Sequence, residues 1–96
     1  MLVEIDRKLA KNSLSAELAR EIAEEMSLDL AALRTSGEIS NDAFLEAGVI
    51  QGGIAVLANM IHSGVNPHEI MTHFQQIQER ATRICLNYPE LSESLQ

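Results

Sequence analysis

The sequence predicts an all-α protein, an elongated helical bundle built on a long antiparallel pair of helices. Apolar residues recur at helical spacing along most of the chain, and only residues 2–6 come close to the alternation of a strand. Helix breakers are scarce, with five glycines and two prolines in 96 residues. A chain of this length forms one domain. We expect that domain to span residues 1–88, followed by a short acidic C-terminal tail, 89–96, that frays.

The C-terminal helix of the pair is expected at residues 67–88. Asn66 is placed to cap it, and Pro67 has the backbone angle that a first helical turn requires. Pro89 then ends the helix. Between these signals the apolar residues are spaced by 4, 3, 4, 3 and 4 positions and predict one buried seam: Ile70, Phe74, Ile77, Ala81, Ile84 and Tyr88.

The central helix is expected at residues 42–63. Ser40, Asn41 and Asp42 are the cap candidates at its start, and Gly64 is the left-handed residue that ends it. Its buried seam repeats the spacing of the C-terminal helix: Ala43, Ala47, Ile50, Ile54, Leu57 and Ile61. Only residues 64–66 separate the two helices, and so short a loop requires them to pack antiparallel as an αα-hairpin.

The N-terminal half is expected to add one or two helices. Apolar residues spaced by four begin the pattern: Leu14, Leu18, Ile22 and Met26. One interpretation continues this helix through Leu30 and Leu33 to Gly37. The other ends it at Ser27, which then caps a second short helix over residues 28–35. Residues 2–10 show the pattern of a further short helix, with apolar residues on one face.

The central helix is apolar nearly all round, and no charged side chain occurs from residue 47 to residue 68. Roughly opposite its buried seam runs a second stripe, apolar but made of small residues: Leu45, Gly48, Gly52, Ala55 and Asn59. A glycine costs about 1 kcal/mol relative to alanine inside a helix, so three of them (Gly48, Gly52 and Gly53) need a reason, and close approach of another backbone is the usual one. We therefore interpret the stripe as a helix-packing or dimer interface and favour a homodimer.

The charge distribution limits the classes of partner. The net charge is −7, and none of the seven basic residues lies between Arg34 and Arg80, which argues against direct binding of nucleic acid. An acidic row at helical spacing is a solvated face or a docking face for a basic partner: Glu17, Glu21, Glu24 and Glu25. The single cysteine, Cys85, fits a reducing compartment, so we expect a cytoplasmic protein. The apolar part of the uncharged run is shorter than the about 20 residues of a membrane span.

No catalytic, metal or cofactor motif stands out. His68 and His73 are five residues apart, about 140° around a helix, whereas a zinc-protease motif needs two histidines on one face. The glycines lack the spacing of a phosphate-binding loop. We therefore expect neither an enzyme nor a bound cofactor or metal.

These observations favour a non-enzymatic protein–protein interaction module, a small adaptor, inhibitor or regulator that docks to a partner protein. Three alternatives stay open. The acidic row could make the protein a mimic of nucleic acid that inhibits a nucleic-acid-binding enzyme. A polar pocket near His62, with Asn59 and Gln51, would suit a small enzyme or a ligand-binding bundle. A DNA-binding regulator is the last, although it lacks a basic recognition helix.

Overall fold

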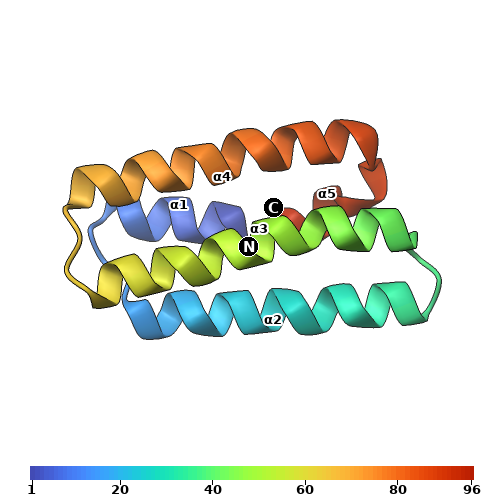
Figure 1. Cartoon of the computed structure of the whole chain (residues 1–96), viewed down its shortest axis with the longest axis horizontal. Coiled ribbons are helices and arrows are strands. Elements are labelled where there is room, and N and C mark those ends of the chain that lie inside the picture. Colours follow the sequence, from blue (N-terminus) through green and yellow to red (C-terminus); the bar gives the residue numbers. More distant parts are fainter.

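A computed structural model describes all 96 residues and confirms an all-α fold with no strand. Three long helices lie side by side, and two shorter ones lie against them (Figure 1). The elements are α1 (Leu2–Ala10), α2 (Ala16–Thr35), α3 (Asn41–His62), α4 (Pro67–Asn87), the single 3-10 turn η1 (Pro89–Leu91) and α5 (Ser92–Leu95). The molecule measures 39 × 22 × 18 Å, so the long helices run along its greatest dimension.

The second helix, α2, is uninterrupted, which decides between the two interpretations of the N-terminal half. The Ser15 hydroxyl accepts a hydrogen bond from the Leu18 N–H at 3.0 Å and caps its start. Ser27 lies exposed in the middle of the helix and begins no new one. The segment is rich in Ala, Leu and Glu, the strongest helix formers, and its buried residues lie on one face from Ala19 to Leu30.

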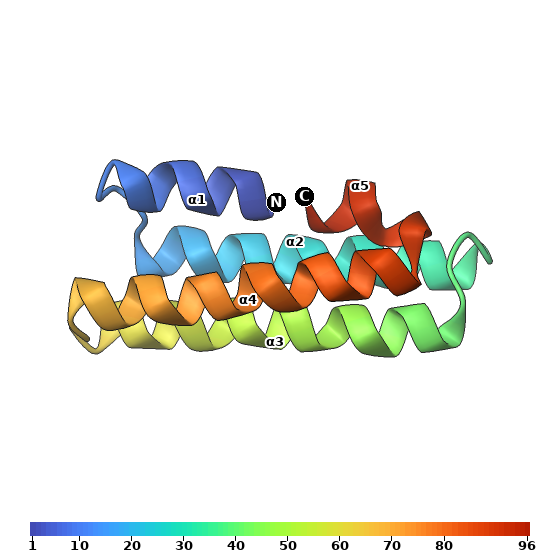
Figure 2. The same cartoon turned by 90° about the horizontal axis from the view of Figure 1, so that it is seen from above.

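The hairpin of α3 and α4 forms from local signals at the joint. The Ser40 hydroxyl accepts from the Ala43 N–H at 3.1 Å and begins α3. Gly64 has a φ of +73°, which a glycine adopts without strain, and it follows the end of α3. The Asn66 side chain then accepts from the His68 N–H at 2.7 Å and begins α4. The two helices run antiparallel and side by side (Figures 1 and 2).

The closest helix pair is α2 with α3, not α3 with α4. Both helices bury alanines, and we call these five residues the alanine seam: Ala19, Ala23, Ala43, Ala47 and Ala58. Small side chains let two helix backbones approach closely, which is why this pair is packed more tightly than the hairpin. The alanine seam fixes which side of α3 is turned inward.

The chain ends pack where a fourth helix would lie. Helices α1 and α5 lie end to end on the side of the bundle opposite α3 (Figure 2). The Val3 N–H donates to the Gln96 carbonyl at 3.2 Å, and the Met1 amine donates to the same oxygen. Leu91 and Leu95 are fully buried. The expectation that residues 89–96 fray was therefore wrong, because these two leucines, four residues apart, provide an apolar face that the core takes up.

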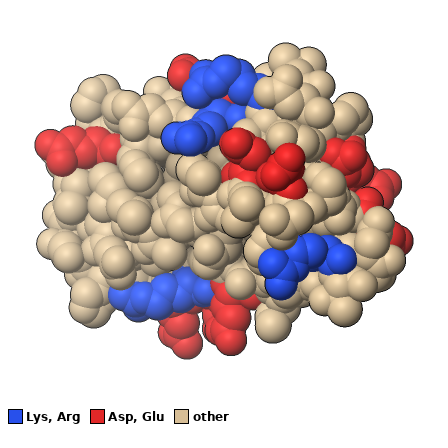
Figure 3. Space-filling view, turned by 45° about the vertical axis from the view of Figure 1, so that its right-hand side comes forward, with Lys and Arg blue, Asp and Glu red and all other residues tan.

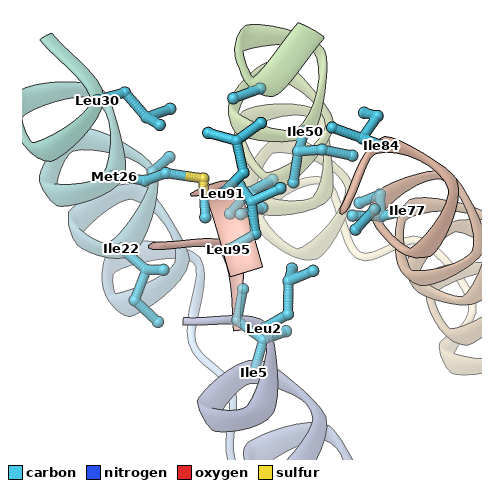
Figure 4. Packing of buried hydrophobic residues seen from close by; sticks show 14 of the residues in the cluster. Leu2, Ile5, Ile22, Met26, Leu30, Ile50, Ile77, Ile84, Leu91 and Leu95 are labelled. Carbon is cyan, nitrogen blue, oxygen red and sulfur yellow. The ribbon is translucent and has the colours of Figure 1, made fainter. Parts of the chain in front are cut away.

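The core is aliphatic, as the composition requires. Side chains of every helix converge in it, with Met26 between Ile22 and Leu30 on α2 and Leu91 and Leu95 lying between the helices (Figure 4). Phe74 is the only fully buried aromatic residue. No polar or charged residue is buried, so the interior offers no polar group for chemistry.

Candidate functional site

The side of α3 that faces away from the core is apolar and uncovered. Leu45, Val49 and Val56 are 59%, 42% and 47% exposed. These three residues belong to a row along the helix in which successive members are 4, 3, 4 and 3 positions apart. We call this row the outer face of α3: Leu45, Val49, Gly52, Val56 and Asn59. This is the spacing with which helices pair with other helices. The helix thus carries one such seam inside the bundle and a second one outside it.

The structure places the predicted small-residue stripe on or beside this outer face. Leu45, Gly48 and Asn59 are exposed, while Gly52 and Ala55 are half-buried. A Cβ atom added at Gly48 or Gly52 would meet no other atom within 4 Å. No helix of the same chain therefore explains why these two positions are glycine.

Gly53 differs from the other two glycines of α3. A Cβ atom there would lie 3.0 Å from Ile77 Cγ1 and 3.2 Å from Ile77 Cδ1, which is tighter than ordinary van der Waals contact. The absent side chain lets α4 lie close against α3 at this point. The Nε2 atom of His73 donates to the Gly53 carbonyl across 3.0 Å, so the same residue also ties α4 to α3.

The small-residue stripe predicted from the sequence did not include Val49 and Val56. Both lie on the spacing that starts at Leu45, and that spacing was the signal that would have found them. They supply most of the aliphatic surface of the outer face because the glycines between them have no side chain. With them, the face becomes a row of aliphatic side chains separated by a gap at Gly52.

The margins of the outer face are polar and in part basic. A shallow hollow of about 210 Å³ separates Val49 and Gly53 of α3 from Gln76 and Arg80 of α4. On the side of α2, the Arg34 guanidinium lies 4.2 Å from the centre of the Phe44 ring, a cation–π contact. The face of the molecule drawn in Figure 3 has a broad area without Lys, Arg, Asp or Glu residues, which lie mostly toward the top, bottom and right of the view. An apolar centre with a polar rim is the usual composition of a protein interface.

The four glutamates of the predicted acidic face are all exposed, but they do not face one way. Glu17, Glu21 and Glu24 follow the helical spacing of the side of α2 opposite its buried residues. Glu25 lies nearer α1: burial lowers the pKa of the Met1 amine, and the charges of Glu4 and Glu25 oppose that shift. Leu28, 66% exposed, continues the row of the first three glutamates. The acidic row is therefore three carboxylates long.

The residues proposed for a pocket near His62 do not line one. His62 and Asn59 are exposed and Gln51 is half-buried, and none of them borders any of the four hollows on the surface. No three His, Cys, Asp or Glu side chains gather closely enough to hold a metal ion. Cys85 is half-buried beside a hollow of about 330 Å³ that Leu2, Ala81 and Leu95 help to line.

By length and composition, α3 would also be able to cross a membrane. Such a helix is weak evidence for a membrane protein, because the core helix of a soluble bundle passes the same test. In this structure α3 packs against α2 and α4 along its inner side.

Comparisons with protein-family models, with curated proteins and with solved structures gave no match to this chain. The outer face of α3 is the feature that the fold leaves without an explanation.

Proposed function

We propose that this protein is a non-enzymatic protein–protein interaction module, a small adaptor, inhibitor or regulator, that docks through the outer face of α3. The observation that carries the proposal is the second apolar seam, spaced like a helix-pairing seam and open to solvent at Leu45, Val49 and Val56. Removing apolar surface from water contributes about 25 cal/mol per Å². A face of this kind gains that free energy only when another surface covers it.

The shape of the face favours a polypeptide as the ligand rather than a small molecule. Small molecules bind in concave pockets that enclose most of their surface. The outer face is the convex side of a helix, and the hollow beside it is shallow. A partner helix lying along α3 would place its side chains between Val49 and Val56, where Gly52 leaves room. Helix pairing therefore fits the face best.

The two other large exposed leucines do not form comparable surfaces. Leu28 on α2 lies near Glu24 and Glu25, and Leu86 on α4 lies near Arg83 and Glu90 in sequence. Single exposed apolar side chains among charged ones are common on soluble proteins and indicate no partner. They supply matched controls, because a change at either position alters an exposed apolar residue without touching α3.

The experiment that tests the proposal is photo-crosslinking in cells of the source organism. A photoreactive amino acid replaces Val56 in one variant and Leu28 in another. We expect discrete protein adducts from position 56 and none from position 28, because only the outer face of α3 is a docking surface. Equal labelling from both positions, or no adduct from either, would contradict the proposal.

A further inference from the structure

We infer that the polypeptide seated on the outer face of α3 is a second copy of this chain, with the two α3 helices antiparallel about a twofold axis that crosses them at Gly52. The inference rests on the proposed function and names its partner. A twofold interface uses the same surface on both copies, so the surface must be complementary to itself when its ends are exchanged. Three features of the face meet that condition.

The first feature is the placement of the apolar residues about Gly52. Val49 lies three positions before Gly52 and Val56 four positions after it. An antiparallel copy therefore brings each Val49 beside the partner's Val56, and the two contacts are equivalent. At the centre, Gly52 faces the partner's Gly52, and the absence of a Cβ atom on both helices lets the backbones approach. The pairing supplies the reason for glycine that the single chain lacks.

The second feature is the charge along the flanking helix α4. The lining of the hollow between α3 and α4 shows which residues of the two helices lie level with each other. Val49 and Gly53 of α3 border it together with Gln76 and Arg80 of α4. Gln76 thus lies about level with Gly52. Exchanging the ends of α4 about this level places Glu69 of one copy level with the partner's Arg83 and about one helical turn from the partner's Arg80. The twofold axis repeats this opposite-charge contact on the other copy.

The third feature is the lack of charged side chains along the middle of the outer face. Each copy carries a net charge of −7, so most ways of bringing two copies together oppose carboxylates to carboxylates. The helix α3 has no charged side chain after Glu46. From Val49 to Asn59 the outer face therefore presents no carboxylate to a second copy.

The size of the face also suits a dimer. A strip along α3 and α4 is about 33 Å long and two helices wide, with axes about 9 Å apart. Its flat projection is roughly 600 Å², and its accessible area is larger because side chains are not flat, which approaches the about 800 Å² per partner of stable interfaces.

The first test measures mass in solution by sedimentation equilibrium. We expect the wild-type protein to sediment at twice its 10.6 kDa, and Val56→Arg to sediment as a monomer with an unchanged helical circular dichroism spectrum. Leu28→Arg and Leu86→Arg are the matched controls and should remain dimers. A wild-type monomer at every concentration overturns the second copy as partner. If position 56 still crosslinks to other proteins in that case, the proposed function stands and only the inference fails.

The second test exchanges the charges and does not depend on apolar packing. Glu69→Arg alone, and Arg80→Glu with Arg83→Glu, should each raise the dimer dissociation constant about tenfold, because each puts like charges opposite one another. Mixing the two variant proteins should restore the wild-type constant in a heterodimer, since both contacts are then of opposite charge. If the mixture dimerises no better than the separate variants, the antiparallel placement of α4 is wrong. A dimer unaffected by these changes and by Val56→Arg uses another surface, which contradicts the inference.

Discussion

The inner and outer sides of α3 use small residues in different ways. On the inner side, α3 lies close to α2, and every residue of the alanine seam is buried. On the outer side, a Cβ atom added at Gly48 or Gly52 would meet no atom of another helix. Small residues inside a bundle are explained by the contact that they permit. The same explanation fails for the outer side unless a second polypeptide supplies the contact.

The three glycines of α3 differ in what surrounds them. Gly53 faces Ile77 at a distance that leaves little room for a methyl group, so its missing side chain is explained by packing within the chain. Gly48 and Gly52 each cost about 1 kcal/mol of helix propensity, and no packing contact within the chain compensates for that cost. Substitutions at Gly53 and at Gly48 or Gly52 therefore distinguish packing within the chain from packing against a second polypeptide.

The largest effect is expected from Ala47→Leu in the alanine seam. Ala47 is fully buried, and the added atoms would force α2 and α3 apart, so the free energy of unfolding should fall by about 3 kcal/mol. The matched control is Gly48→Leu, the next residue in the chain, and both changes are made in the monomeric Val56→Arg background, where the side chain added at position 48 enters solvent. Urea titration followed by circular dichroism measures both. Similar losses for the two variants would show that the sides of α3 do not differ.

A gain of stability is expected from Gly52→Ala in a monomeric background that carries Val56→Arg. A Cβ atom at Gly52 meets nothing in the chain, so the better helix propensity of alanine should raise the free energy of unfolding by about 1 kcal/mol. Urea titration of the two monomers gives the difference. In the dimer the same change should weaken association, because the methyl group lies where the partner's backbone approaches. A loss of stability in the monomer would reveal a contact that the chain makes at Gly52.

The corresponding change at Gly53 should be close to neutral. Alanine improves the helix propensity by about 1 kcal/mol, but the new methyl group lies 3.0 Å from Ile77 Cγ1 and pushes that side chain aside. The combined variant Gly53→Ala with Ile77→Val removes the Cδ1 atom and relieves part of the crowding. We expect the gain from Gly53→Ala to be larger in that background than in the wild type, as measured in a double-mutant cycle. Equal gains in both backgrounds would mean that Ile77 does not limit the position.

The smallest effect concerns the junction of α1 and α5, which lies away from α3. Burial lowers the pKa of the Met1 amine below its ordinary value of 8.0. Between the folded pKa and 8.0 the unfolded chain binds the extra proton, so stability should rise slightly with pH through this window and then level off. Thermal melting across that range measures the slope, and an N-terminally acetylated protein is the control that should show none. A slope that survives acetylation arises from another group.

The sequence predicted the helices well because their signals are local. The caps at Ser40 and Asn66 and the seams of the two long helices depend on residues within a turn or two of each other. The C-terminal turn was missed because Leu91 and Leu95 are buried only by contact with distant helices, and their acidic neighbours suggested a tail. Likewise, which glycine of α3 faces α4 depends on how the two helices are rotated about their axes. Spacing along one helix does not contain that angle.

The most direct test of the pairing of α3 helices is disulfide trapping in a Cys85→Ser background. One preparation carries Val49→Cys and the other Val56→Cys, and the two are mixed under mild oxidation. The account predicts a mixed disulfide between positions 49 and 56, formed faster than either homodisulfide and absent when Leu28→Cys replaces Val56→Cys. Preferential homodisulfides at position 49 would show parallel helices, and no disulfide with either valine position would show that the outer face of α3 does not meet a second copy.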